Sequence, residues 1–177
     1  MLDLETLGTR PDCVVLTLGA IKFCPFTPDK FGEGLYLRLD VDQQLALGRD
    51  VQQDTMDWWS KQDPLVREEA LGESNRVNLE EATRQLNKFL VGANDIWAQG
   101  PVFDIAILEN LYRQLGKPTP WNFWQIRDSR TLFGVHGDPR KKGRTGHHDA
   151  LADCVYQAQG VQAIYQQQNI KKPEYKK

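Results

Sequence analysis

Apolar and polar residues alternate at the start of the chain. This predicts a short β-strand over residues 1–6, with Leu2 and Leu4 on one side. A largely apolar run at residues 14–23 predicts a second strand, and residues 35–39 predict a third. Turn-forming residues mark a hairpin connection between these two runs: Pro25, Pro28, Gly32 and Gly34. Three strands joined by short connections indicate an antiparallel meander.

Further along, the pattern changes to helical spacing. Asp54 stands where it could cap a helix that continues through Trp58 and Trp59. Residues 79–90 form a clear amphipathic pattern, with the apolar positions Leu79, Ala82, Leu86, Phe89 and Leu90 on one side. Short strands are predicted at residues 96–99, before Gly100 and Pro101, and at residues 123–127.

Two more helices complete the predicted elements. One opens at Asp104 and carries the apolar positions Ile107, Leu108, Leu111, Tyr112 and Leu115. The last helix carries a single apolar stripe: Leu151, Cys154, Val155, Ala158, Val161, Ile164 and Tyr165. The elements predict an α/β fold with a mixed sheet of about five strands flanked by helices.

Length and composition set the broad class. At 177 residues the chain fits one domain with a full core, and its hydrophobic content of 40% fits a globular protein. No apolar run has the length of a membrane span, and no signal peptide precedes the first strand. Three widely spaced cysteines indicate reduced thiols and a cytoplasmic protein: Cys13, Cys24 and Cys154.

Four acidic residues stand beside apolar runs, in three separate stretches. Asp3 and Glu5 project from one face of the first strand, Asp104 opens a helix, and Asp153 lies early in the last helix. Close carboxylates repel one another, and a divalent cation offsets that repulsion directly. Taken singly, Asp3 and Glu5 also fit a solvated edge strand, and Asp104 also fits a helix N-terminus.

A histidine accompanies the last of these acids. On an ideal helix, His148 and Asp153 would lie about 140° apart. We therefore expect His148 just before the helix, reaching over from the loop, and Asp149 at the N-cap. His147 fits a loop residue, and a lone histidine such as His148 is also often structural.

The net charge of −2 argues against a general nucleic-acid coat protein, but basic residues cluster locally. Residues 127–144 contain six basic side chains (Arg127, Arg130, Arg140, Lys141, Lys142 and Arg144) and two acidic ones (Asp128 and Asp138). Such a loop suits a polyanion that must approach carboxylates, although a solvated loop has the same composition. Trp58 and Trp59 are candidate stacking platforms for bases, and at most one of the pair should face substrate.

The three stretches together resemble a known family. D-x-E-T on a first strand, F-D before a middle helix and H-x-A-x-x-D at a late helix resemble the DEDDh 3′–5′ exonucleases. This is the DnaQ-like and RNase T-like group of the RNase H-like superfamily. The segments L-D-L-E-T-L-G-T-R-P-D and D-T-M-D-W-W look like its phage branch, which includes exonuclease A and the exonuclease VIII-type domain.

The resemblance implies an RNase H-like fold over residues 1–168, followed by a basic tail at residues 169–177. It implies Asp3, Glu5, Asp104 and Asp153 as ligands of two Mg²⁺ or Mn²⁺ ions, and His148 as general base. It also implies that the backbone of Leu7 and Gly8 holds the terminal nucleotide, and Thr6 beside them is a further candidate for substrate binding. Phe103 is a candidate wedge against a base or a core residue, and Arg140, Lys141, Lys142 and Arg144 are candidate phosphate contacts.

The implied reaction releases 5′-mononucleotides from single-stranded nucleic acid, with DNA favoured and RNA as the alternative. A phage origin would place the protein in the cytoplasm of the bacterial host. Two other functions remain open at this stage: a non-catalytic nucleic-acid-binding member of the fold, and a metal-dependent phosphatase or nucleotidase. The presence of all five site residues argues against the first, and the basic loop with its paired tryptophans argues against the second.

Overall fold

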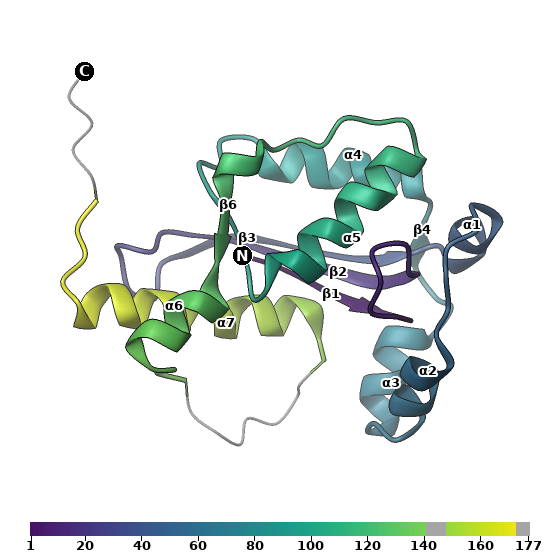
Figure 1. Cartoon of the computed structure of the whole chain (residues 1–177), viewed down its shortest axis with the longest axis horizontal. Coiled ribbons are helices and arrows are strands. Elements are labelled where there is room, and N and C mark those ends of the chain that lie inside the picture. The colour runs from purple at the N-terminus through teal and green to yellow at the C-terminus, as the bar shows by residue number, and fades with distance from the viewer. Residues whose placement is uncertain (141–147, 173–177) are drawn as a thin grey trace.

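The computed structural model describes residues 1–140 and 148–172. Strands come first, and helices dominate the rest of the chain (Figure 1). The elements in chain order are β1 (Leu2–Thr6), β2 (Val15–Phe23), β3 (Phe31–Leu39), α1 (Val41–Ala46), α2 (Gln53–Ser60), α3 (Pro64–Leu71), β4 (Arg76–Val77), α4 (Leu79–Leu90), β5 (Ile96–Ala98), α5 (Pro101–Gln114), a 3₁₀ turn (Phe123–Gln125), β6 (Ile126–Asp128), α6 (Ser129–His136) and α7 (Ala150–Gln167).

The predicted antiparallel meander is confirmed. β1 pairs with β2 and β2 pairs with β3, both antiparallel, and β4 adds a short parallel strand at the far edge of β3. β5 and β6 form a separate two-stranded parallel sheet. The α/β class is therefore confirmed, whereas the predicted single sheet of five strands is wrong: the described residues form a four-stranded and a two-stranded sheet.

A side chain occupies the place where the two sheets would join. β5 packs beside β1, but the N–H of Leu4, in the middle of β1, donates to Oδ1 of Asp104 at 3.1 Å. Because this donor is taken by a carboxylate, it is not available to a neighbouring strand. The first strand therefore meets the second sheet partly through the side chain of a predicted site residue.

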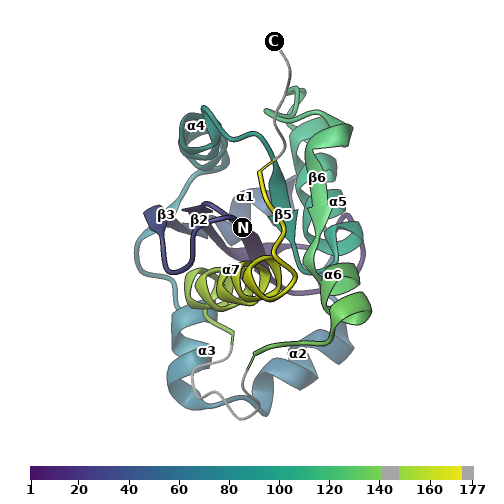
Figure 2. The same cartoon turned by 90° about the vertical axis from the view of Figure 1, so that its left-hand side faces the viewer.

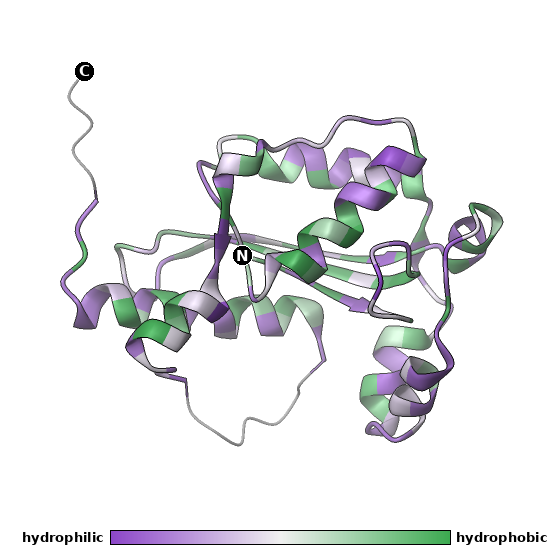
Figure 3. Ribbon diagram, in the orientation of Figure 1, coloured by the Kyte–Doolittle hydropathy of each residue, from purple (hydrophilic) through white to green (hydrophobic). Residues whose placement is uncertain are grey.

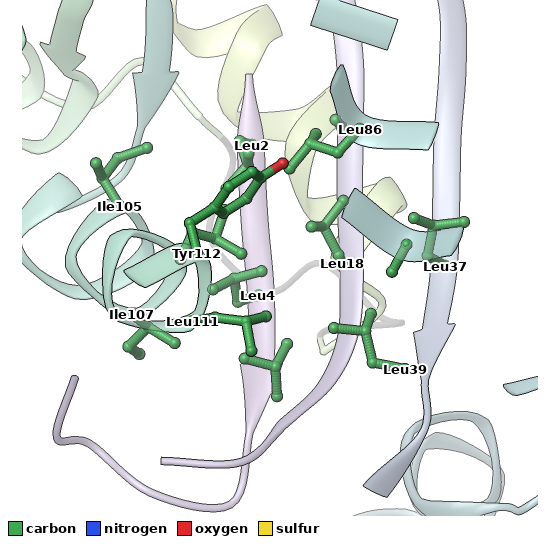
Figure 4. Close-up of a cluster of buried hydrophobic side chains, with 14 of the residues drawn as sticks. Leu2, Leu4, Leu18, Leu37, Leu39, Leu86, Ile105, Ile107, Leu111 and Tyr112 are labelled. Atoms are coloured by element: carbon green, nitrogen blue, oxygen red, sulfur yellow. The ribbon is translucent and has the colours of Figure 1, made fainter. Parts of the chain in front are cut away.

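The main sheet is covered on both faces. Figure 2 shows α4 and α7 on opposite sides of β2 and β3. Leucines of the first three strands pack with α4 and α5 in the larger core, which includes Tyr112 (Figure 4). On the other face α7 packs over Ile21 and Trp97. Figure 3 shows hydrophobic and hydrophilic residues alternating along these helices, as expected for elements with one buried side.

Several element boundaries differ from the sequence expectations. Gln52, not Asp54, is the N-cap of α2, and Asp54 lies in the first turn. α5 begins at Pro101, after Gly100 with its positive φ, so Asp104 lies within the first turn and does not open the helix. The strand predicted at 123–127 is a 3₁₀ turn followed by β6.

Four short elements were not predicted: α1, α3, β4 and α6. Each has eight residues or fewer, which is too short for a clear hydrophobic period. By contrast, the long pattern of α4 is confirmed, with Leu79, Ala82, Leu86 and Phe89 buried and Leu90 partly buried. No helix in residues 1–140 and 148–172 combines the length and apolarity needed to cross a membrane.

Candidate active site

Three of the four predicted carboxylates lie together. Asp3 and Glu5 project from the same face of β1, because side chains two residues apart on a strand share a face. Asp153 comes from the first turns of α7, which packs over β1 and β2. One carboxylate oxygen from each of Asp3, Glu5 and Asp153 lies within 4.8 Å of the other two. The strand and the helix thus assemble an acidic cluster from residues 150 positions apart in the chain.

Gly19 makes this close approach of α7 possible. It pairs with Asp3 in the β1–β2 register, and a Cβ atom there would overlap the backbone of Ala150 and Leu151. The thiol of Cys154 donates to the carbonyl oxygen of Gly19 at 3.2 Å. The first turn of the helix therefore rests directly on the backbone of β2, which brings Asp153 over the acidic face of β1.

The start of α7 also fixes His148. As predicted, Asp149 is the N-cap, its side chain accepting from the N–H of Ala152 at 2.7 Å, and His148 precedes the helix. The N–H of His148 donates to Oδ2 of Asp153 at 2.9 Å, which holds its backbone at a φ of 70°. In this position Nδ1 of His148 lies 3.9 Å from Oε1 of Glu5. A group able to accept a proton is thus held beside the cluster.

The two adjacent tryptophans have different surroundings. Trp59 is 1% exposed, and its Nε1 donates to the carbonyl oxygen of Thr6 at 2.9 Å. Trp58 is 40% exposed, and its ring meets that of His148 edge-on, with centroids 4.7 Å apart. Only Trp58 therefore offers an accessible aromatic surface next to the cluster, while Trp59 anchors the end of β1.

Burial and the neighbouring carboxylates make Glu5 and Asp104 hard to ionise. Burial, followed by the charges of Asp3 and Asp153, raises the pKa of Glu5 from its ordinary value of 4.5 to about 9. Burial and the charge of Asp3 also raise the pKa of Asp104 well above its ordinary value. A divalent cation would reverse this balance, because its charge favours the ionised carboxylates.

The donor set fits such a cation. Carboxylate oxygens are the ligands that Mg²⁺ and Mn²⁺ prefer, and three of them from Asp3, Glu5 and Asp153 already converge. Asp104 stands apart from this group of three. It is buried next to Asp3, and one of its oxygens is engaged by the N–H of Leu4.

The structure places the other candidate residues as follows. Both backbone groups of Leu7 are used: its N–H donates to Val14 and its carbonyl oxygen accepts from Gln52, at 2.8 Å each. The carbonyl oxygen of Gly8 accepts from the hydroxyl of Thr6 at 2.7 Å. The N–H of Leu7 is therefore already used, whereas its carbonyl oxygen keeps a second lone pair, and the proposed backbone contact to a nucleotide stays a prediction. Phe103 is half-buried and packs against the larger core.

Arg140 makes contacts within the protein, and its role as a phosphate contact stays a prediction. Its guanidinium is paired with both carboxylate oxygens of Asp138, at 2.8 and 2.7 Å, and lies over the ring of Phe133. These contacts hold Arg140 against the segment that follows α6. Lys141, Lys142 and Arg144 lie outside the described residues, as does His147.

Two residues of the site have no counterpart in the sequence expectations: Gly19 and Gln157. Nε2 of Gln157 donates to Oδ1 of Asp3 at 2.8 Å. The role of Gln157 could have been suspected from its spacing, because it follows Asp153 by four residues and so shares its face of the helix. Gly19 gave no such signal, since nothing in the sequence indicates which helix will lie on it.

Comparison with known protein families gives one match. The family model described as "Rv2179c-like: 3'-5' exoribonuclease Rv2179c-like domain" matches residues 1–165, nearly the whole chain. No curated protein matches the chain significantly.

Proposed function

The chain belongs to the Rv2179c-like 3′–5′ exoribonuclease domain family, a family of nucleases, and from this premise we propose that it is a metal-dependent 3′–5′ exonuclease of single-stranded RNA. The convergence of Asp3, Glu5 and Asp153 beside His148 carries the proposal. The expectation that DNA is the favoured substrate has no support in the family description, which names RNA. Membership of the DEDDh group, and of its phage branch, stays a prediction.

We assign the cation ligands to Asp3, Glu5 and Asp153, with Asp104 as the neighbouring fourth carboxylate. When bound, one or two divalent cations would supply positive charge to the scissile phosphate and lower the pKa of water. The four acids would supply the negative charge that retains the cations, and a bound cation would favour the ionised form of Glu5, whose pKa is raised to about 9 without one. The proposed ligands come from β1, α5 and α7, so the site forms only when these three elements pack together.

His148 takes the proton of the attacking water. The oxygen of that water forms a bond to the last phosphorus of the strand, the bond from phosphorus to the 3′ oxygen breaks, and that oxygen takes a proton from solvent. The products are a 5′-mononucleotide and a strand with a new 3′-hydroxyl. Asp153 supports His148 by accepting its backbone N–H, and Trp58 packs against the imidazole ring.

We assign the terminal base to the exposed face of Trp58, since base stacking on aromatic rings is strong and tolerant of sequence. A single strand reaches such a platform directly, whereas the end of a blunt duplex must first fray. Unpairing costs about 1.4 kcal/mol for an average base-pair step. We therefore expect single strands to be degraded faster than blunt duplexes.

A direct test uses one sequence prepared as 5′-labelled RNA, as 5′-labelled DNA, and as each annealed to its complement. Incubation with Mg²⁺ should shorten the single-stranded RNA from its 3′ end in steps of one nucleotide, with the DNA and the duplexes slower. Chelation of the metal should stop the reaction. An intact RNA would identify a binding protein, and loss of a terminal phosphate alone would identify a phosphatase. Either result would overturn the proposal.

A further inference from the structure

We propose that Gln157 is a positioning residue, which holds the carboxylate of Asp3 in the orientation that cations require. The inference rests on the proposed function, since it assumes that Asp3 is a metal ligand. Its basis is the hydrogen bond from Nε2 of Gln157 to Oδ1 of Asp3, 2.8 Å long, which joins the middle of α7 to the first strand. No other role was assigned to this side chain by the sequence motifs.

The placement of Gln157 follows from that of Asp153. The two residues are four apart on α7, so they project from the same face and reach the same strand. Gln157 is 5% exposed, and its side chain is enclosed between the helix and the sheet. An ionised carboxylate only accepts hydrogen bonds, so the amide must present its nitrogen to Asp3. Asp3 therefore fixes which way the amide of Gln157 points.

This orientation leaves the other end of the amide unsatisfied. Oε1 of Gln157 is buried and has no hydrogen-bond partner among residues 1–140 and 148–172. An apolar side chain of similar size would avoid this unfavourable burial. Among the described residues, this side chain makes one hydrogen bond, the one to Asp3. We therefore infer that Gln157 serves to orient Asp3 and not to stabilise the packing of α7.

The chemistry of an amide suits this task. Asp3 lies among mutually repelling carboxylates, and rotation of its side chain would relieve that repulsion when no cation is bound. A lysine or arginine would hold Asp3 but would also neutralise the charge that attracts the metal. A neutral amide restrains the carboxylate, occupies one of about four lone-pair positions, and leaves the negative charge for the cation. Mutation of a residue that hydrogen-bonds a metal ligand in this way typically lowers metal affinity by about 10–100-fold.

The test compares Gln157→Met with the parent. Methionine keeps the length of the side chain and removes the donor. Calorimetry should show Mn²⁺ binding weakened by about 10–100-fold, and the upward shift of Tm on adding Mn²⁺ should shrink accordingly. The metal-free Tm should not fall. In nuclease assays the loss of kcat should be recovered at high Mn²⁺, with KM for the oligonucleotide unchanged.

Gln162→Met is the matched control. Gln162 is a second buried glutamine of α7. Its Oε1 also has no partner in the described part of the chain, and its Nε2 donates to the carbonyl oxygens of Cys24, Thr27 and Lys30. Its replacement should lower the metal-free Tm and leave Mn²⁺ affinity unchanged. This contrast separates an effect on Asp3 from a general effect of replacing a buried amide on this helix.

The outcomes are distinguishable. Failure of the parent protein to bind Mn²⁺ would refute the proposed function itself. A parent that binds Mn²⁺, with Gln157→Met binding it equally well, would overturn only the role of Gln157. If the variant does not fold, the side-chain amide of Gln157 in the parent provides the test by NMR. Slow hydrogen exchange and a shift on adding Mg²⁺ are expected, and fast exchange without a shift would refute the role.

Discussion

Gly19 of β2 lies directly beneath Ala150, so close that a single added carbon at Gly19 would overlap the backbone of the helix. Since Gly19 is also the cross-strand partner of Asp3, this contact sets the distance between β1 and α7 at the acidic cluster. The site depends on a missing side chain as much as on the charged ones.

We therefore expect Gly19→Ala to lower the free energy of unfolding by about 3 kcal/mol, near the upper end for overpacking, because backbone atoms cannot move aside easily. Urea unfolding measures this. Gly134→Ala is the control: Gly134 lies in α6 with open space around it, so alanine there should be neutral or slightly stabilising. Equal effects of the two substitutions would contradict the close packing of α7.

Asp3→Asn should abolish nuclease activity while the protein stays folded. Removal of one negative charge weakens the hold on cations, so the rise of Tm on adding Mn²⁺ should be much smaller than in the parent. Thermal unfolding with and without Mn²⁺ measures this. Asp42→Asn, an exposed acid of α1, should leave both the activity and the Mn²⁺ effect unchanged. Full activity of Asp3→Asn would refute the metal site.

His148→Ala should reduce kcat by about 10²–10⁴, the usual contribution of general acid–base catalysis. The imidazole lies beside the proposed cation site, 3.9 Å from Glu5, but is not itself a proposed cation ligand. Its removal should therefore leave the attacking water without a proton acceptor and keep the cation ligands in place. His147→Ala should have a far smaller effect. Single-turnover rates at saturating Mg²⁺ measure both effects. A larger loss with His147→Ala would show that His148 is not the general base.

The pKa of Glu5 predicts a pH dependence of stability. Between pH 4.5 and about 9, Glu5 is protonated in the folded metal-free protein and ionised in the unfolded chain. The folded state then binds the additional proton, so this contribution to stability is complete below pH 4.5 and is lost as the pH rises towards 9. Because the cation requires ionised carboxylates, stabilisation by Mg²⁺ should grow over the same range.

The measurement is Tm from pH 5 to pH 9, roughly the window of this shift, in chelator and in Mg²⁺. Glu5→Gln cannot ionise at this position, so its metal-free Tm should decline less with pH than that of the parent. The difference between parent and variant isolates Glu5 from other buried groups such as Asp104. Parallel pH curves for parent and variant would show that Glu5 titrates normally.

Trp58 and Trp59 should separate binding from stability. Trp58→Ala should weaken oligonucleotide binding by about 5–150-fold, equivalent to about 1–3 kcal/mol for one stacked base, with little loss of stability. Trp59→Ala should lower the free energy of unfolding by about 3–5 kcal/mol, because it removes a buried ring and its bond to Thr6. Fluorescence anisotropy and urea unfolding measure the two effects. Trp58→Phe should retain most of the binding. If Trp58→Phe weakened binding as much as Trp58→Ala, stacking of a base on this ring would be excluded.

Long hydrophobic patterns in the sequence were enough to predict the meander, α4 and α7. The family resemblance implied that Asp3, Glu5, Asp104 and Asp153 form one site, and helix geometry predicted that His148 precedes its helix. The element predictions succeed because the period of a strand or helix fixes which side chains share a face. The sequence could not show that Leu4 binds Asp104 and leaves two separate sheets, nor that Arg140 is held by Asp138. Single hydrogen bonds decide both, and hydrophobic patterning does not encode them.

The sequence by itself determined the chemical groups of this protein: four carboxylates, a histidine and two tryptophans in a recognisable order. Only the tertiary structure decided which of them are accessible and what holds them. Trp59 is enclosed while Trp58 is exposed, and Gln157 restrains Asp3 from a helix that Gly19 admits. The physical reason is that burial and close approach depend on the packing of elements far apart in the chain, which no local pattern specifies.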